Sequence, residues 1–407
     1  MSTRPNPRDE RIDSAYAWVR VFASVAIMAI GFSGLYSIVV ALKPVAADLG
    51  ATRGGVSFAY AVLFAGFGFG GILMGWWSDR VGIMWPTLTG SVAIAAGLFL
   101  AGQATALWQI VLAFGFLVGF LGMSCMMVPL VANITHWFDR RRGIATSVVI
   151  SGSYLAGTMW PPLLQIGIDE VGWRETWMRV GILCLVVMTP LSLLLRPRLN
   201  ISSDSAREDS RRRRALGFTP TTMQVLLCMA GLGCCVAMAT PQAHIVAHAT
   251  DLGHPAARGA EMLSLVFFGG FVSRIIYGWA SDRIGGLRTL VLGSVGQAVT
   301  IACFIPVEGL IELYVVCALF GLSQGGIVPS YALIIRRYYL AGEAGLRLGW
   351  IMLFTMLGMA FGGWLAGVLF DLTGTYATAF TAAIAFNVLN LLIAALFLLR
   401  SRIPVFA

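Results

Sequence analysis

The 407-residue chain is too apolar for a water-soluble globular protein, because 58% of its residues are hydrophobic and only 12% are charged. A formal net charge of +9 is compatible with nucleic-acid binding, but the basic residues follow the loops of a membrane topology instead. The composition therefore excludes a soluble globule and indicates an integral membrane protein.

Taken in chain order, twelve apolar segments have about the 20 residues that cross ~30 Å of hydrocarbon. They lie near residues 17–47, 55–77, 84–103, 107–135, 143–168, 177–195, 221–249, 259–281, 288–307, 310–335, 346–370 and 376–399. The polar stretch before the first segment differs from a cleaved signal peptide, so we expect the first helix to remain in the mature protein. The sequence predicts an all-α membrane protein with twelve transmembrane helices.

The basic residues gather on one side of this predicted topology. With the N-terminus inside, the inner segments carry 22 of the 28 Lys and Arg residues. The outer loops carry four, namely Arg53, Arg174, Arg179 and Arg258. This asymmetry follows the positive-inside rule and predicts a multi-pass protein of the inner or plasma membrane with both termini in the cytoplasm. Anionic lipid headgroups are then the expected contact of the basic residues, and no nucleic-acid partner is expected.

The sequence gives no indication of a metal, cofactor or catalytic site. All of the cysteines fall within apolar segments, where they are interpreted as small hydrophobic residues rather than disulfides or metal ligands. They are Cys125, Cys184, Cys228, Cys234, Cys235, Cys303 and Cys317. The sequence has no nucleotide-binding loop, metal-ligand cluster or nucleophile–base pairing, so we expect neither a cofactor nor an enzyme.

Two stretches of the chain recur at the same interval. "GWWSDRVG" begins at Gly75 and "GWASDRIG" begins at Gly278, 203 residues later. "ADLG" and "TDLG", which end at Gly50 and Gly253, keep that interval. The matches include charged loop residues, so they indicate a duplicated unit rather than chance similarity between apolar helices. A duplication on this scale points to a transporter that works by alternating access.

One long polar interruption separates the two copies. It contains four consecutive arginines, Arg211 to Arg214, and we interpret it as a flexible cytoplasmic linker. The predicted organisation is two pseudo-symmetric six-helix halves, at residues 1–195 and 221–407, joined by the linker at 196–220.

The duplicated G-x-x-x-D-R-x-G loops resemble the motif of the major facilitator superfamily, which implies the major facilitator fold. We expect the glycines to permit close helix approach, and Asp79 and Asp282 to meet helix ends and arginines across the seam between the halves. These contacts are predicted to gate the cytoplasmic side and not to bind substrate. The gating residues are Gly75, Asp79, Arg80, Gly82, Gly278, Asp282, Arg283 and Gly285.

Two further stretches resemble the monocarboxylate transporter group, which includes oxalate-formate exchangers. "DSAYAWVRVFA", from Asp13 to Ala23, is similar to the first-helix pattern of that family, although Ser14 and Ala15 replace paired glycines. "WFDRRRGIATSVVISGS", which begins at Trp137, is similar to its fourth-to-fifth-helix pattern, with Ser147 replacing a glycine. The resemblance implies an organic anion as the substrate.

Arg274 is the strongest candidate for binding that anion. It lies eight residues before Asp282, which places it about 12 Å inside the membrane along a helix. An arginine at this depth usually marks a substrate or ion path, and the alternative is a neutralised arginine that joins helices. Its duplicated position is Gly71, so the fold does not require this cation. The family resemblance implies that Arg274 binds the substrate carboxylate.

Lys43 is the single lysine of the chain, and it also matches a family position, the first-helix lysine. It stands about 8 Å from Asp48 at the end of its helix, so snorkelling to the interface is the alternative. Unlike arginine, a buried lysine can lose its proton in a working pH range. In the family an aspartate often precedes the eighth-helix arginine by four residues, and here that position is Gly270. Lys43 is therefore also the candidate proton carrier.

Three weaker candidates are polar side chains within the apolar segments. Tyr331 and Tyr154 can donate a hydrogen bond to a carboxylate, although tyrosines that seal helix interfaces are equally common. His244, four residues before His248, can bind substrate or shuttle a proton, although such histidines more often pack through hydrogen bonds.

These observations predict a secondary transporter of a small organic monocarboxylate, similar to lactate or pyruvate, that is coupled to protons. One alternative is an anion exchanger of the oxalate-formate type without proton coupling. An alternative of another class is a transporter-like membrane receptor, which is disfavoured because no soluble sensor domain is attached. The expected partners are the organic anion, a proton and membrane lipids, and we expect the protein to function as a monomer.

Overall fold

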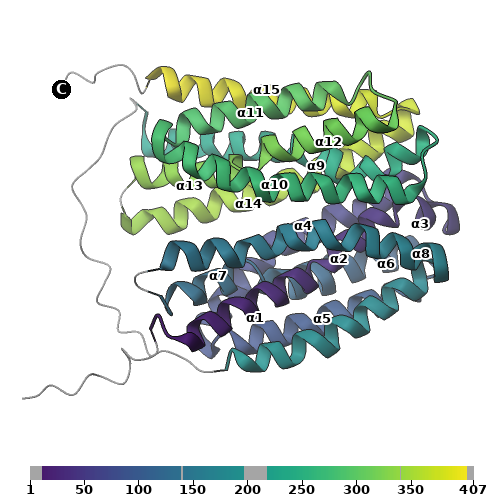
Figure 1. The fold of residues 1–407 in the computed structure, drawn as a ribbon, viewed down its shortest axis with the longest axis horizontal. Helices are drawn as coiled ribbons and strands as arrows, with labels where there is room; N and C mark the ends of the chain where they lie inside the picture. The colour runs from purple at the N-terminus through teal and green to yellow at the C-terminus, as the bar shows by residue number, and fades with distance from the viewer. Residues whose placement is uncertain (1–11, 139–140, 197–217, 340, 401–407) are drawn as a thin grey trace, which may run out of the picture. The chain divides into compact units, whose positions relative to one another are not determined.

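The computed structural model describes residues 12–138, 141–196, 218–339 and 341–400, and every regular element in these ranges is a helix (Figure 1). Most of the predicted linker at 196–220 lies outside the described residues. The chain forms two compact units. Unit 1 comprises Met1–Val45 and Val62–Ser202, and unit 2 comprises Ala46–Ala61 and Ser203–Ala407.

The first half of the chain folds into helices and two irregular helical segments. In order these are α1 (Ala15–Gly31), α2 (Ser33–Val40), α3 (Leu42–Asp48), α4 (Arg53–Val81), α5 (Met84–Gly102), α6 (Leu107–Leu112), the π-helical η2 (Ala113–Gly122), the short 3₁₀ turn η3 (Met123–Cys125), α7 (Val128–Thr135) and α8 (Arg142–Leu194). Within unit 1, α8 packs against α1 and α5, and η2 packs against α5.

The second half of the chain is built from seven further helices. They are α9 (Pro220–Asp251), α10 (Ala256–Ile284), α11 (Gly286–Cys303), α12 (Leu310–Gln324), α13 (Ile327–Tyr338), α14 (Ala341–Thr373) and α15 (Ala377–Arg400). Within unit 2, α9 packs against α14, α15 and α10, and α10 packs against α12 (Figure 1).

The helices of the described residues include 11 that are long and apolar enough to cross a membrane. One of them, the Ile144–Leu194 stretch of α8, covers two predicted segments. Its backbone leaves the helical conformation at Gly172 (φ 82°, ψ 164°), a region that glycine adopts without strain. Because α8 is therefore two consecutive membrane-crossing helices, all twelve predicted segments are helical and the all-α membrane architecture is confirmed.

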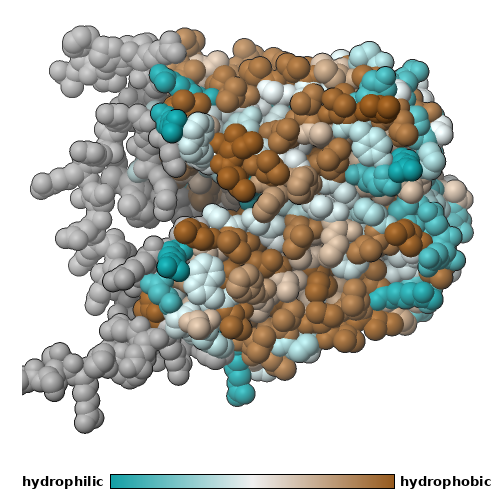
Figure 2. Space-filling model, in the orientation of Figure 1, coloured by the Kyte–Doolittle hydropathy of each residue, from teal (hydrophilic) through white to brown (hydrophobic). Residues whose placement is uncertain are grey.

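Large apolar side chains lie on the surface as well as in the cores. Figure 2 shows hydrophobic residues covering the middle stretches of the helices and hydrophilic residues gathering near their ends on the face in view. Phe22 in unit 1 and Ile275 in unit 2 are 63% and 67% exposed. A surface of this kind is stable in hydrocarbon, where apolar side chains need no partner.

The duplication extends to the backbone conformation. Helices α4 and α10 each contain 29 residues, and both of their ends are related by the interval of 203. The turns before them place Gly50 and Gly253 at positive φ (58° and 87°), and the turns after them do the same for Gly82 and Gly285 (85° and 80°). The two copies therefore enter and leave this helix in the same way.

Three of the spans are not continuous helices. The first is interrupted at Phe32 and at Ala41, the fourth changes from α6 to η2, η3 and α7, and the tenth is interrupted between Gln324 and Ile327. At Ala41 the cause is Pro44, which has no N–H to bond to the carbonyl four residues earlier. Interrupted spans are tolerated where protein groups satisfy the freed backbone.

Glycines let α4 approach η2 closely within unit 1. A Cβ on Gly66 or Gly70 would lie closer than 3.0 Å to the carbonyl oxygen of Gly115 or Phe120. In the opposite direction, a Cβ on Gly119 would collide with the Leu63 carbonyl. Small residues at such an interface bring backbones into van der Waals contact, which drives helix association in lipid.

We expect Gly66→Ala to lower stability, because its methyl group meets rigid backbone that cannot move aside. Overpacking of this kind costs about 1–3 kcal/mol. Gly71→Ala is the matched control in the same helix, because its Cβ meets no described atom within 4 Å. Thermal unfolding of the purified protein in detergent checks this, and equal melting temperatures for the two variants would contradict the interface.

Candidate functional site

The repeated motif has the same local structure in both copies. The N–H of Gly82 donates to the carbonyl of Ser78 (2.8 Å), and that of Gly285 donates to Ser281 (2.9 Å). Two residues before each glycine, the guanidinium of Arg80 lies 4.0 Å from the ring centroid of Trp76, and that of Arg283 lies 4.0 Å from the ring centroid of Trp279. The motif therefore ends each helix with a glycine cap and an arginine held over an indole.

The roles expected of the other motif residues stay predictions. A Cβ on Gly75 or Gly278 would meet no described atom within 4 Å. The side chains of Asp79 and Asp282 lie outside the described part of the structure. Their predicted contacts remain a prediction.

Arg274 lies on α10 directly beside the interruption between α12 and α13. A Cβ on Gly325 would come within 2.8 Å of the Arg274 nitrogen, so the two backbones touch here. The N–H of Gly325 donates to Ser273 Oγ (3.1 Å), whose own proton bonds to the carbonyl of Gly270 or Gly321 (3.1 and 3.2 Å). These contacts fix the α10 backbone at Arg274, whose side chain is half-buried.

The duplicated helix has a glycine at the position that corresponds to Arg274. The counterpart of Arg274 is Gly71, where a Cβ would enter open space among the described residues. The preceding residue packs tightly in both copies, Gly70 against Phe120 and Ser273 against Gly325. On α10, Ser273 therefore faces the contact with Gly325, whereas Arg274, the next residue, lies on a more open side of the same helix.

Lys43 lies on α3, two residues after the interruption at Ala41, and its side chain is half-buried. Tyr154, on α8, is also half-buried. Both belong to unit 1, whereas Arg274, Tyr331 and His244 belong to unit 2. The candidate residues are thus divided between the two units.

Tyr331 is fully buried within unit 2, where it joins three helices. Its hydroxyl donates to Asn390 Oδ1 (3.0 Å), and Asn390 Nδ2 donates to Ser294 Oγ (2.7 Å). Asn387 adds a bond from Nδ2 to the Ser294 carbonyl (2.8 Å). The hydroxyl of Tyr331 is therefore used to seal α13 against α15 and α11, which favours the packing interpretation of this residue.

His244 is also fully buried, with both ring nitrogens engaged. Nε2 lies 2.7 Å from the Gly363 carbonyl, and Nδ1 lies 3.1 Å from the hydroxyl of Tyr376. Because a carbonyl only accepts, Nε2 carries the proton, and Nδ1 accepts from Tyr376 in the neutral ring. Tyr376 stands in the turn before α15, where burial raises the pKa of its hydroxyl above the ordinary value and keeps it a donor.

Sequence reasoning missed an ionic cluster around Arg53, at the start of α4. Its guanidinium forms an ion pair with Asp251, with Nη2 2.7 Å from Oδ1, and donates to the Tyr376 hydroxyl (3.0 Å). It also stacks on Phe370, 3.8 Å from the ring centroid. Asp371 accepts the backbone N–H of Arg53 at 3.0 Å. One feature of the sequence could have indicated this cluster, because Arg53 is one of only four basic residues in the predicted outer loops.

Arg20 is a second charged residue whose role was not predicted. It lies on α1, is 0% exposed, and donates from Nη2 to Asn133 Oδ1 (2.7 Å). Its guanidinium also lies 4.2 Å from the ring centroid of Trp137. These contacts join α1 to α7 within unit 1, so we interpret Arg20 as a structural cation.

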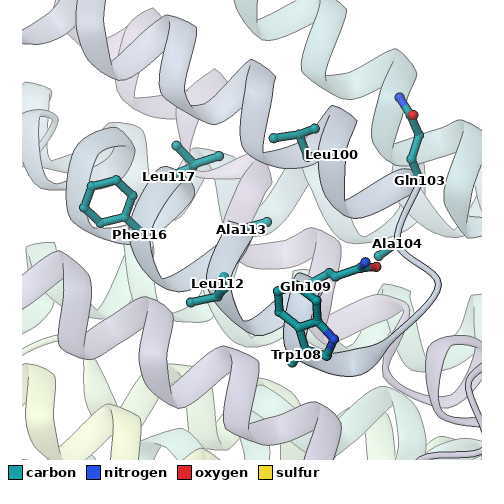
Figure 3. Close-up of a pocket in the computed structure, with 9 residues that line it drawn as sticks. All are labelled: Leu100, Gln103, Ala104, Trp108, Gln109, Leu112, Ala113, Phe116 and Leu117. Atoms are coloured by element: carbon teal, nitrogen blue, oxygen red, sulfur yellow. The ribbon is translucent and has the colours of Figure 1, made fainter.

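A pocket of about 530 Å³ opens on the surface of unit 1 between α5 and the α6–η2 segment (Figure 3). Its lining has no charged side chain, and Trp108 and Leu112 are exposed on the surface. The lining residues are Leu100, Gln103, Ala104, Trp108, Gln109, Leu112, Ala113, Phe116 and Leu117. Without a cation this pocket is not a candidate for binding a carboxylate.

A polytopic helical chain built from a duplicated unit has the architecture of a membrane transporter. The family model described as Major Facilitator Superfamily matches residues 21–260 and 225–405, and the chain belongs to that superfamily. It is therefore a transporter and not an enzyme, as expected from the sequence.

Among its relatives, Monocarboxylate transporter 13 of Rattus norvegicus is 27% identical over 389 residues, which cover 93% of this chain and 88% of the relative. Monocarboxylate transporter 11 of Homo sapiens is 25% identical over 384 residues, which cover 90% and 80%. These similarities extend over nearly the whole chain and agree with the predicted resemblance to the monocarboxylate transporter group.

The structure resembles that of the nucleoside transporter NupG, with a TM-score of 0.74 at 13% identity over 95% of this chain and 99% of the other. A peptide transporter POT in complex with alafosfalin gives a TM-score of 0.73 at 14% identity over 94% of each chain. These similarities confirm the predicted major facilitator fold, and at this identity they concern the fold alone.

We expect Tyr331→Phe to lower stability without weakening substrate binding, because its hydroxyl is bonded to Asn390 inside unit 2. Losing one hydrogen bond in a membrane protein costs about 0.6 kcal/mol on average. The melting temperature and the substrate dissociation constant check the two halves of this expectation, with Tyr154→Phe as the comparison. A loss of affinity at unchanged stability would place Tyr331 in the binding site.

Proposed function

We propose that this protein is a secondary active transporter of a small organic monocarboxylate, works by alternating access and is coupled to protons. The observation that carries the proposal is the position of Arg274, within membrane-spanning α10, ten residues before the end of this helix and beside the interruption between α12 and α13. A cation at such depth is costly and is typical of a substrate or ion path. The planar guanidinium offers parallel donors that match the two oxygens of a carboxylate.

The relatives support the choice of substrate class. Proteins named monocarboxylate transporters are similar to this chain over 93% of its length in the rat example and 90% in the human one. The single guanidinium at Arg274 suits a single carboxylate, and Lys43 of the first span is proposed as a further cation that attracts the anion. Tyr154 and His244 remain candidates for additional substrate contacts, although His244 is engaged with Tyr376 and Gly363 in this conformation.

We assign the coupling proton to Lys43. The position four residues before Arg274 is Gly270, so the carboxylate that the family often has there is missing. A lysine in a low-dielectric site can lose its proton, and an arriving anion raises its pKa so that it gains one. The same glycine favours one other function, an anion exchanger of the oxalate-formate type in which no proton moves.

The proposed location is the inner or plasma membrane. Both termini are proposed to lie in the cytoplasm, because the segments on that side of the predicted topology hold most of the arginines. The two motif turns at Gly82 and Gly285 then face the cytoplasm. Their shared caps and arginine–indole contacts support a gating role for the motif in both halves. Asp79 and Asp282 are the proposed acidic partners in that gate.

We expect Arg274→Lys to weaken substrate binding by about tenfold or more, because the charge is kept but the paired donors are lost. Binding of lactate, pyruvate, formate and oxalate to the purified protein measures this. Arg258→Lys is the matched control, since Arg258 lies on the same helix but is exposed and pairs with Glu261. Equal affinities in parent and Arg274→Lys would remove Arg274 from the site.

We expect Lys43→Arg to keep anion exchange but lose accumulation driven by a pH gradient, because arginine does not release its proton. The measurement is uptake of labelled substrate into proteoliposomes with and without an inward proton gradient. Accumulation equal to that of the parent would show that Lys43 is not the proton carrier. A parent that ignores the gradient would establish the exchanger instead.

A further inference from the structure

A second pocket of unit 1, of about 470 Å³, lies where the end of α4, the start of α5 and the end of α8 meet. Most of its wall is apolar, and Arg196 is the charged residue of the described lining. Trp85 and Leu193 are 50% and 52% exposed, so the pocket opens on the surface. The described lining residues are Val81, Gly82, Met84, Trp85, Leu193 and Arg196. The pocket therefore combines a surface that suits hydrocarbon with one guanidinium.

The end of α8 holds the backbone of Arg196 in place. The N–H of Arg196 donates to the carbonyl of Leu193 (3.1 Å), and the carbonyl of Leu194 accepts the hydroxyl of Tyr16 from α1 (2.6 Å). Leu195 is 1% exposed and anchors this end of the helix in unit 1. The Arg196 side chain is exposed, and within the described residues its guanidinium has no ion pair or hydrogen bond. A cation on a fixed backbone is thus available to an external anion.

The start of α5 adds a favourable field to the same pocket. Met84 and Trp85, which line it, are the first two residues of that helix. The first N–H groups of a helix have no partner within the helix, and no side chain caps α5 at Ile83. The helix dipole also favours an anion at this end. An anion bound to Arg196 in this pocket is therefore stabilised by α5 as well.

The pocket lies at the level where the polar headgroups of a membrane are expected. Three membrane-crossing stretches end beside it, at Ser78, Met84 and Leu194. Tryptophan is enriched at this level because its ring is apolar and its N–H is polar, and the half-exposed Trp85 occupies such a place. On the proposed orientation this end of unit 1 faces the cytoplasmic leaflet, whose surface is negative because it contains anionic lipids.

We propose that this pocket binds the headgroup of one anionic phospholipid. The phosphate pairs with the guanidinium of Arg196 near the first N–H groups of α5, the indole of Trp85 lies beside the glycerol, and the acyl chains continue over the apolar surface next to Leu193. This goes beyond the general attraction of basic segments to a membrane, because a pocket selects one lipid molecule at one place. The inference does not depend on which substrate the protein transports.

Size and charge both favour this occupant. Small-molecule sites have volumes of about 300–1,000 Å³, so about 470 Å³ is enough for a phosphate and its glycerol but leaves the acyl chains outside. The larger surface pocket of unit 1, at Trp108, has no charged side chain in its described lining and offers an anionic headgroup no partner. The guanidinium of Arg196 therefore distinguishes the proposed site from a general apolar depression.

The copy in unit 2 provides a matched comparison. At the interval of 203, Trp85 corresponds to Arg288 and Arg196 corresponds to Leu399. Arg288 is exposed in the first turn of α11. Arg400, which follows Leu399, lies 4.0 Å from the ring centroid of Phe218. The counterpart thus has basic residues without the tryptophan, so replacing Arg288 removes one charge from the same side of the predicted topology and leaves the pocket intact.

Native mass spectrometry of the full-length protein, titrated with phosphatidylglycerol in detergent, tests the site because it gives a dissociation constant for the first bound lipid. We expect Arg196→Gln to raise that constant about fivefold, which corresponds to the ~1 kcal/mol that one basic residue contributes near an anionic surface. Arg288→Gln should leave it unchanged. Equal effects of the two variants would indicate general charge attraction and would overturn the pocket as a site.

Other probes separate the lipid from other occupants. Phosphatidylcholine, which has no net charge, should bind the parent more weakly than phosphatidylglycerol and be insensitive to Arg196→Gln. Glycerol 3-phosphate has the same phosphate but no acyl chains, so displacement of the lipid at an equal concentration would indicate a site for soluble phosphates and contradict the proposal. A parent without preference for phosphatidylglycerol would leave the pocket to an uncharged lipid or to the chain after Arg196, which also contradicts it.

Discussion

The hydrocarbon interior of a membrane offers no hydrogen bonds, and this constraint determines where the polar groups of the protein lie. Serines within the spans bond to the preceding turn, as Ser37 Oγ does to the Ser33 carbonyl at 2.9 Å. Arg20 shows how a buried charge is stabilised, because its guanidinium donates a hydrogen bond to Asn133 and lies over the ring of Trp137. Polar residues therefore mark either an internal junction, as Tyr331 does, or a place where a ligand or water is expected.

The interrupted spans follow from the same constraint. Breaking a helix frees backbone groups that must find partners, and at the tenth span Ser273 supplies one for Gly325. The serine sits on α10 immediately before Arg274, so the device that permits the interruption also fixes the backbone of the candidate anion-binding residue. The interruption and the cation are thus one local arrangement. This coupling is the physical reason to look for the substrate there.

The sequence predicted the features that depend on local chemistry. Apolar length gave the spans, and the recurrence of "SDR-x-G" gave the duplication, which the caps at Gly82 and Gly285 confirm in the backbone. It did not predict the Arg53 cluster, because Arg53 and Asp251 are 198 residues apart and only the folded chain brings them together. Apolar length did separate the two spans of α8, at residues 169–176, and the structure places the break in the helical conformation at Gly172 within that interval.

Comparison of the two copies separates what the fold needs from what the function needs. Both copies retain the glycine caps and the arginine–indole pairs of the motif, which are therefore part of the common unit. Four other cations are not retained, since Arg20, Lys43, Arg53 and Arg274 correspond to Met223, Val246, Ala256 and Gly71. Burying a charge is costly in either copy, so each unmatched cation needs a compensating role. Asn133 and Trp137 supply that role for Arg20, and Asp251 and Tyr376 supply it for Arg53. For Arg274 the proposed function adds a substrate anion as a partner during transport, and for Lys43 it adds the coupling proton.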